Sequence, residues 1–341
     1  MRNVFLTLMT WTLTPRAVGL AEIRAPFSIA FLMSILCLGT CAAASANADG
    51  ARHIVIVLGE NVAIQREVAT RFETLVAGNV RGDVVVDVEP SPESARARLG
   101  QGSVDLVVTV GTSAAQGLRD VALTTPVLHV LIGRSSYDAL YGLDKPAASR
   151  RAAIVLDQPW DRQLHLVKLL VPGARQLSAL VGAGSQAGAS ALTAAAVKRG
   201  MTLRAVSVSD RDDFGDALSE ALATTDALCA LPDSQILSPA NAKWLLYGAF
   251  QKRVPVIGFS RAYVTAGALG AVYSTPEQIA KQAAEWVAQS WRGEAALLGA
   301  VSPKYFSVAI NTSVAHALGL SPGSEEELTR LLAGRDEVEL R

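Results

Sequence analysis

Small residues with hydroxyl, amide or carboxylate groups recur directly after the apolar segments of this sequence. Groups of this kind donate and accept hydrogen bonds, and several of them together can hold a small polar molecule. Phe259 and Tyr273 can stack on an apolar part of such a molecule. The candidate polar contacts are Glu60, Asn61, Gly111, Thr112, Ser113, Gly133, Arg134, Asp157, Ser185, Gln186, Asp233 and Ser234.

Some of these residues suggest a particular charge on the bound molecule. Thr112 and Ser113 directly precede a predicted helix over residues 114–123. Hydroxyls and backbone amides at the start of a helix can hold an anion such as a carboxylate. The same residues can instead act as helix caps, and the two roles are compatible. Asp233 can hold an ammonium group or be an ordinary turn residue, and Phe259 and Tyr273 can be core residues.

No combination of a catalytic nucleophile and a base stands out in the sequence. The segment GFSRA (258–262) follows a strand, but it lacks the second glycine that a nucleophile elbow requires. No two histidines or cysteines have the spacing of metal ligands. We therefore expect no catalytic residue, no enzyme activity and no metal. The histidines are predicted to be packed or solvated: His53, His129, His165 and His316.

Nucleotide and nucleic-acid binding are also disfavoured. The segment GAGSQAG (182–188) follows a strand, but its third glycine is displaced from the dinucleotide-binding pattern. A phosphate-binding Gly-Lys-Ser/Thr sequence is missing as well, so no cofactor is expected. Lys plus Arg and Asp plus Glu both total 31. Because no segment concentrates the basic residues, no nucleic-acid partner is expected.

The elements that position these residues follow from repeated apolar runs separated by helix-length segments. Continuous apolar runs without polar alternation are typical of strands buried on both faces, as in parallel sheets covered by helices. Ser91-Pro92, Ser238-Pro239 and Thr275-Pro276 predict helix starts. The predicted strands cover residues 53–59, 104–111, 126–133, 152–157, 176–182, 202–209, 226–233, 254–260 and 268–274.

This pattern predicts an α/β fold with two doubly wound parallel-sheet lobes joined by hinge crossings. The polar stretch 137–151 is the expected first crossing, with others near 261–267 and at Arg292-Gly293. The predicted N-terminal lobe contains residues 51–150 and about 264–292. The predicted C-terminal lobe contains residues 151–263 and about 293–320, and residues 321–341 form a surface tail.

Residues 1–48 have the features of a secretory signal peptide. Positively charged residues precede an apolar stretch over 25–38, and small residues follow. Cleavage after Ala46 or Ala48 fits this pattern, although a lipid on Cys41 is an alternative. The mature protein is therefore expected to be exported. Cys229 lies inside an apolar run, which predicts a buried and unreactive thiol.

Several segments resemble ABC-transporter substrate-binding proteins of the tryptophan-binding-protein-like group. Their order and spacing carry the resemblance, which covers residues 53–320. The segments are VDLVVTVGT (104–112), DALCALPD (226–233), VPVIGF (254–259), AGALG (266–270), FSVAIN (306–311) and AHALGL (315–320).

The resemblance implies a type I periplasmic binding fold, in which two lobes close on a ligand. It also implies delivery of a small solute to an inner-membrane ABC permease. Two loops expected at the cleft differ from the family pattern. The chain has GRSS (133–136) where the family often has Asp-Pro-Val, and LDQP (156–159) where it often has Thr-Gly-Val.

Our first hypothesis is a monomeric periplasmic solute-binding protein, with an amino-acid-like or carboxylate ligand between its lobes. Thr112 and Ser113 would bind an anionic group, and Asp233 a polar or cationic one. An alternative is an envelope sensory or accessory binding protein that works with a receptor or an outer-membrane uptake system. An exported α/β enzyme is a third possibility, for which the sequence offers neither nucleophile nor base.

Overall fold

A computed structural model describes residues 51–100, 103–121, 123–142, 150–209, 213–233, 236–294 and 299–339 of the chain. The predicted signal peptide (1–48), the alternative lipid site at Cys41 and the candidate residue Ser234 lie outside the described residues.

The first sheet has six strands in the order β11-β5-β4-β3-β1-β2, and the described pairs are all parallel. It is built from β1 (Arg52–Leu58), α1 (Ala63–Asn79), β2 (Val84–Glu89), α2 (Pro92–Leu99), β3 (Leu106–Val110), α3 (Thr112–Gly117), β4 (Val127–Ile132), α4 (Arg134–Tyr141), β5 (Arg151–Val155), α10 (Pro276–Trp291) and β11 (Gly299–Val301). We call this sheet and its helices the first lobe.

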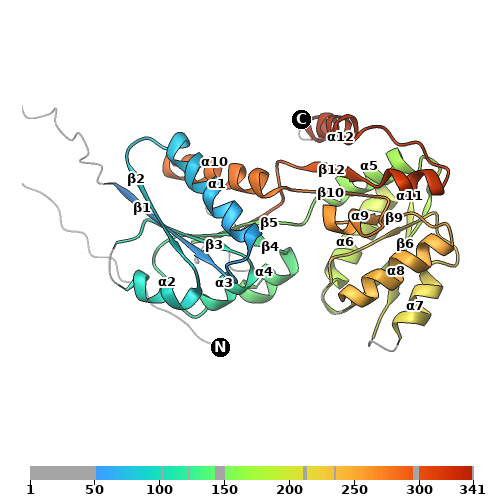
Figure 1. The fold of residues 1–341 in the computed structure, drawn as a ribbon, viewed down its shortest axis with the longest axis horizontal. Helices are drawn as coiled ribbons and strands as arrows, with labels where there is room; N and C mark the ends of the chain where they lie inside the picture. Colours follow the sequence, from blue (N-terminus) through green and yellow to red (C-terminus); the bar gives the residue numbers. More distant parts are fainter. Residues whose placement is uncertain are drawn as a thin grey trace, which may run out of the picture. The chain divides into compact units, whose positions relative to one another are not determined.

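Alternate side chains of the first sheet enter two different cores. Ile54, Ile56 and Leu58 pack with α1 and α10, whereas Val55 and Val57 pack with α2 and α3. Helices α1 and α10 accordingly lie on one face of the sheet and α2 and α3 on the other (Figure 1). Burial on both faces explains the unbroken apolar runs in the sequence.

The second sheet has six strands in the order β12-β10-β9-β8-β6-β7. Its described pairs are parallel except for β10 with β12, which are antiparallel. The second lobe is built from α5 (Trp160–Leu170), β6 (Gln176–Val181), α6 (Gln186–Lys198), β7 (Thr202–Ser207), α7 (Phe214–Ala221), β8 (Ala227–Cys229), α8 (Pro239–Gln251), β9 (Val256–Gly258), α9 (Arg261–Thr265), β10 (Gly270–Tyr273), β12 (Ser307–Ile310), α11 (Thr312–Ala317) and α12 (Glu325–Glu339).

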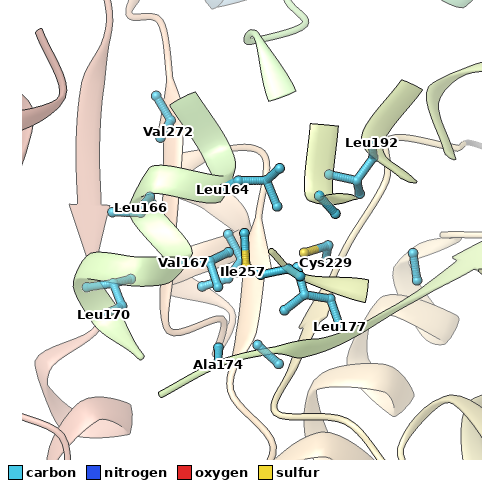
Figure 2. Packing of buried hydrophobic residues seen from close by; sticks show 14 of the residues in the cluster. Leu164, Leu166, Val167, Leu170, Ala174, Leu177, Leu192, Cys229, Ile257 and Val272 are labelled. Carbon is cyan, nitrogen blue, oxygen red and sulfur yellow. The ribbon is translucent and has the colours of Figure 1, made fainter. Parts of the chain in front are cut away.

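One core of the second lobe forms where α5 and α6 cover the sheet. Leu164 and Val167 of α5 pack with Leu177 of β6 and Ile257 of β9 (Figure 2). Cys229 belongs to the same cluster, and its burial raises the pKa of the thiol to about 12. The prediction that this cysteine is buried is therefore confirmed.

The two sheets share one topology, because β1 to β5 and β6 to β10 have the same spatial order, second-first-third-fourth-fifth. The predicted fold class, two doubly wound parallel-sheet lobes, is confirmed. The predicted helix starts are confirmed as well. Ser91 and Ser238 accept hydrogen bonds from the third residue that follows each, and Thr275 forms a capping box with Gln278.

The predicted crossings between the lobes were wrong in position. Strand β5 pairs with β4, so the chain leaves the first sheet after Val155 and not within 137–151. Strand β10 pairs with β9, so the return comes after Tyr273 and not near 261–267. Strand β11 pairs with β5, so the last crossing follows Val301 and not Arg292. In each case the strand stays with its sheet because pairing with its neighbours satisfies its backbone groups.

The expected surface tail is also wrong, because residues 325–339 form helix α12. Leu328 and Leu332 of α12 are 3% and 1% exposed and belong to the core beside α5. Thr329 Oγ1 accepts a hydrogen bond from Val308 N (3.0 Å), which covers the edge strand β12. This helix therefore completes the second lobe.

His129 of β4 lies in the first lobe among other buried rings, as the sequence analysis expected for a packed residue. Its Nδ1 is 2.7 Å from Thr109 Oγ1, and its ring stacks on Tyr141 at 4.9 Å. Burial, with a smaller contribution from the positive charge of Arg151, lowers the pKa of His129 to about 3. The folded protein consequently holds this imidazole neutral.

Because the pKa of an unfolded histidine is about 6.5, the unfolded chain binds this proton well before the folded one. We expect the free energy of unfolding to fall by about 2 kcal/mol between pH 7 and pH 5 through His129 alone. His129→Phe keeps a ring and should remove that part of the pH dependence in urea unfolding. The exposed His316→Gln is the control. Equal pH slopes in the wild type and His129→Phe would contradict this account.

Candidate functional site

The strand order of each sheet defines one place for a ligand. In the first lobe, the neighbouring strands β1 and β3 are followed by helices on opposite faces of the sheet. In the second lobe, the neighbouring strands β6 and β8 are followed by helices on opposite faces as well. In sheets of this order, ligands bind beyond the carboxyl ends of the strands at such a switch point. The turns after β1 and β3, and those after β6 and β8, are therefore the candidate site.

The turn after β1 is held by Gln65 of α1. Gln65 Oε1 accepts hydrogen bonds from the backbone N–H groups of Gly59 and Glu60, both at 3.0 Å. The Ser113 hydroxyl, in the first turn of α3 (Thr112–Gly117) that follows β3, donates to Glu60 Oε1 at 2.7 Å. The structure thus brings residues that follow β1 and β3 together at this switch point.

Gly111 follows β3 with a backbone conformation that favours glycine, because its φ is 100°. A Cβ atom at this position would lie 2.6 Å from Gln65 Nε2, so a side chain would displace Gln65. Gly111 is also the residue before α3, where no side chain caps the helix. The alternative role of Thr112 or Ser113 as a cap was wrong, since both lie within α3, which runs from 112 to 117 and not from 114 to 123.

The turns after β4 and β5 form a second polar group in the first lobe. The backbone N–H of Arg134, at the start of α4, donates to Asp157 Oδ2 at 2.6 Å. The Arg134 side chain donates to the carbonyl oxygen of Ala300 on β11 at 3.3 Å. Gly133 precedes α4, and a Cβ there would lie 3.8 Å from Asp157 Oδ2. Three sequence candidates therefore meet here.

A buried polar group lies at the switch point of the second lobe. The Ser185 hydroxyl, in the turn after β6, donates to Asp233 Oδ2 at 2.8 Å and accepts from Gly182 N at 3.0 Å. Ser185 and Asp233 are only 5% and 6% exposed. Any side chain on Gly182 would collide with this carboxylate, because the Cβ would lie 2.8 Å from Asp233 Oδ2.

The other candidates lie apart from these groups. Asn61 and Gln186 are exposed, and Asn61 Oδ1 accepts a hydrogen bond from Arg66 at 3.2 Å. Phe259 packs on the Tyr263 ring at a centroid distance of 5.0 Å, within the core beside α9. The Tyr273 hydroxyl accepts a hydrogen bond from Arg261 at 2.6 Å. The aromatic candidates are thus engaged with their own lobe.

Hydrogen bonds that are partly or fully buried connect the three segments that join the lobes. Gln158 Nε2, in the first segment, donates to Ser274 Oγ in the second at 2.9 Å. Ser274 Oγ donates in turn to the carbonyl oxygen of Tyr305 in the third at 2.7 Å. Arg162 donates to Gln158 Oε1 and to the carbonyl oxygen of Pro303, at 2.5 and 3.1 Å. We call these residues the hinge network.

A family model described as "ABC transporter substrate binding protein" matches residues 92–329, which is most of the chain. The chain belongs to this family. The resemblance found in the sequence is therefore confirmed. Among curated proteins no sequence matches.

Solved structures of substrate-binding proteins share the fold of this family member. A Streptococcus pneumonia ABC domain in complex with L-Trp is 20% identical with a TM-score of 0.56, and covers 82% of this chain and 99% of its own. A substrate-binding protein with adhesive properties from Clostridium difficile is 18% identical with a TM-score of 0.66, covering 81% and 97%. A periplasmic ribose ABC transporter protein from Conexibacter woesei is 14% identical with a TM-score of 0.52, covering 82% and 97%.

The chemistry offered by the site is hydrogen bonding and charge. In the described part of the chain, no group of three or more His, Cys, Asp or Glu side chains is arranged to hold a metal ion. Nor does any described helix combine the length and apolar character needed to cross a membrane.

Sequence reasoning missed Gln65, Gln158 and Arg162. Gln65 occupies the buried stripe of α1 together with Val68 and Phe72, so a polar residue at an apolar position was the available signal. Gln158 precedes α5 and Arg162 lies in its first turn, and their contact spans four residues. Their partners come from segments more than 100 residues away, which no local pattern reveals.

We expect Ser185→Ala to lower the free energy of unfolding by about 1–3 kcal/mol, because it removes a donor from a buried carboxylate and an acceptor from Gly182 N. Urea unfolding measures this change. Ser190→Ala on the exposed side of α6 is the matched control and should change stability by less than about 0.5 kcal/mol. Equal losses for the two variants would show that the Ser185–Asp233 contact does not stabilise the fold.

Ser274→Ala should also cost about 1–3 kcal/mol, since the buried Gln158 amide loses its acceptor and Tyr305 loses a donor. Ser302→Ala, in the third segment and outside the hinge network, should be close to neutral. Urea unfolding of both variants tests this. A neutral Ser274→Ala would mean that the hinge network contributes little to stability.

Proposed function

We propose that this chain is a periplasmic solute-binding protein that captures a small organic solute between its lobes and delivers it to an inner-membrane ABC permease. The observation that carries the proposal is the pair of switch points. Each lobe of this family member has polar groups just beyond the two strands of its switch point. These strands are β1 and β3 in the first lobe, and β6 and β8 in the second. A protein that encloses a solute between two lobes needs contacts from both.

Family membership supports the transport role and its location outside the cytoplasm. The related structures bind different solutes, since one is a complex with L-Trp and another is a ribose transporter protein. Their names therefore support a small polar solute without selecting one. The hinge network supports closure as a rigid-body movement, because its three segments are joined to each other by hydrogen bonds.

Binding without turnover is part of the proposal. The Ser260 hydroxyl, in the segment that most resembled a nucleophile turn, accepts a hydrogen bond from Tyr263 N and so caps α9. His129 is buried away from solvent, and its lowered pKa makes it a weak base. These contacts give Ser260 and His129 structural roles.

A solute screen tests the function. Thermal unfolding of the refolded protein against amino acids, carboxylates, amines and sugars should show one chemical class that raises the melting temperature, because a ligand bound only by the folded state stabilises it. That ligand should also reduce the radius of gyration in X-ray scattering and be recovered chemically unchanged after incubation. Turnover of the ligand would contradict the proposal, as would stabilisation without compaction.

A further inference from the structure

Gln65 of α1 is a polar side chain in a buried position. It is 7% exposed and belongs to the buried stripe of α1 with Val68 and Phe72. A primary amide has one acceptor oxygen and two N–H donors, and a buried group without a partner costs free energy. The partners of both ends of this amide therefore have to be accounted for.

The oxygen end of the Gln65 amide is occupied. Oε1 accepts hydrogen bonds from the backbone N–H groups of Gly59 and Glu60, both at 3.0 Å. Because both of these partners are donors, the atom that faces them is the oxygen and not the nitrogen. The orientation of the amide is thereby fixed, and Nε2 lies on the other side of Cδ.

The nitrogen end of the amide faces the residue that follows β3. A Cβ atom on Gly111 would lie 2.6 Å from Gln65 Nε2 and 3.4 Å from Cδ, so the nitrogen is the nearer of the two. In the described part of the chain, Nε2 has no hydrogen-bond acceptor. The fully buried unpaired atoms of the described residues are His129 Nε2, Ser178 Oγ and Tyr263 Oη, and Gln65 Nε2 is not one of them. Solvent, and hence a solute, therefore reaches its two N–H groups.

Backbone donors lie at the same switch point. A Cβ atom on Gly59 would lie 2.8 Å from Ala114 N, so the turn after β1 directly contacts the start of α3. Helix α3 has no side-chain cap, and among the described residues the N–H groups of Thr112 and Ser113 have no acceptor. Gln65 Nε2 is thus accompanied by other donors that a solute can use.

Charged side chains of both signs are present at this turn. Glu60 accepts a hydrogen bond from the Ser113 hydroxyl, and Arg66 donates to the oxygens of Asn61. Glu60, Asn61 and Arg66 are all exposed. Interactions between exposed charges are weak in water. The neutral N–H donors, and not a net charge, therefore decide which group is bound here.

We propose that the solute presents an oxygen acceptor, as a carboxylate or a carbonyl group does, to Gln65 Nε2. This inference rests on the proposed function. The lone pairs of such an oxygen match the N–H donors, whereas an ammonium group brings only donors and would leave those of Gln65 unpaired. Gln65 is then a specificity-determining residue. One end of its amide holds the turn after β1, and the other selects the solute.

Matched solutes that differ in one group test the proposal on the wild-type protein. One series is leucine, leucinamide and isopentylamine, and another is tryptophan, tryptophanamide and tryptamine, with isocaproate, indolepropanoate, ribose and inositol added. Thermal shift and calorimetry of the refolded protein at neutral pH measure binding. For the series that binds, removal of the carboxyl or amide group should weaken binding at least about tenfold. The acid and the amide distinguish a carboxylate from a carbonyl group.

Gln65→Glu tests the residue itself. A glutamate oxygen still accepts from Gly59 N and Glu60 N, but the other end of the side chain loses both donors and gains negative charge. We expect the bound acid or amide to lose at least about tenfold in affinity, and the ratio of its affinity to that of the matching amine to fall. The urea midpoint should stay near that of the wild type. Gln116→Glu is the matched control, because Gln116 is exposed on α3 of the same lobe and its replacement should leave affinity unchanged.

The outcomes separate the two proposals. An amine that binds as tightly as its acid and amide, or binding confined to ribose or inositol, overturns the acceptor assignment and leaves the solute-binding function intact. Unchanged affinity in a folded Gln65→Glu protein also overturns the assignment. If Gln65→Glu does not fold, the wild-type comparison of acid, amide and amine still decides. Failure of every solute, here and in the wider screen, removes both proposals.

Discussion

Burial of the central strands on both faces is the constraint on which the rest of this structure depends. A strand covered by helices on each side has little room for polar side chains along its length, so hydrogen-bonding groups are displaced to the turns. The few exceptions are accommodated internally, as the contact between Thr109 and His129 shows. Parallel pairing then brings the turns of neighbouring strands to the same edge of the sheet. The polar groups of these turns therefore gather at one edge, where a ligand can bind.

The polar groups at these edges are organised first for folding. Gln65 fixes the turn after β1, and Asp157 fixes the start of α4. Ser185 satisfies both Gly182 N and the buried Asp233 carboxylate in the second lobe. Such internal bonds hold each turn in one conformation, which lowers the cost of ordering it around a ligand.

Much of the fold could be predicted from the sequence, because apolar runs and helix-capping residues are local signals. Ser91, Ser238 and Thr275 mark helix starts where the structure has them. The crossings could not be placed in this way, since β5, β10 and β11 are assigned to a sheet by backbone pairing, which an apolar run does not specify. Helix α12 was misjudged for a related reason, because its buried leucines are spaced among many charged residues.

The candidate site was partly predictable as well. Glu60, Ser113, Arg134, Asp157, Ser185 and Asp233 follow strands in the sequence, but which of them pair with each other is recognisable only in three dimensions.

The central claim is that one solute is held by the turns of both switch points at once. Amide hydrogen exchange with and without the stabilising solute tests this most directly, because it reports on each turn separately. The account predicts slower exchange in residues 59–61 and 111–113 of the first lobe and in 182–186 of the second, together with the hinge residues near Gln158 and Ser274. Protection confined to one lobe, or located away from these turns, would contradict it.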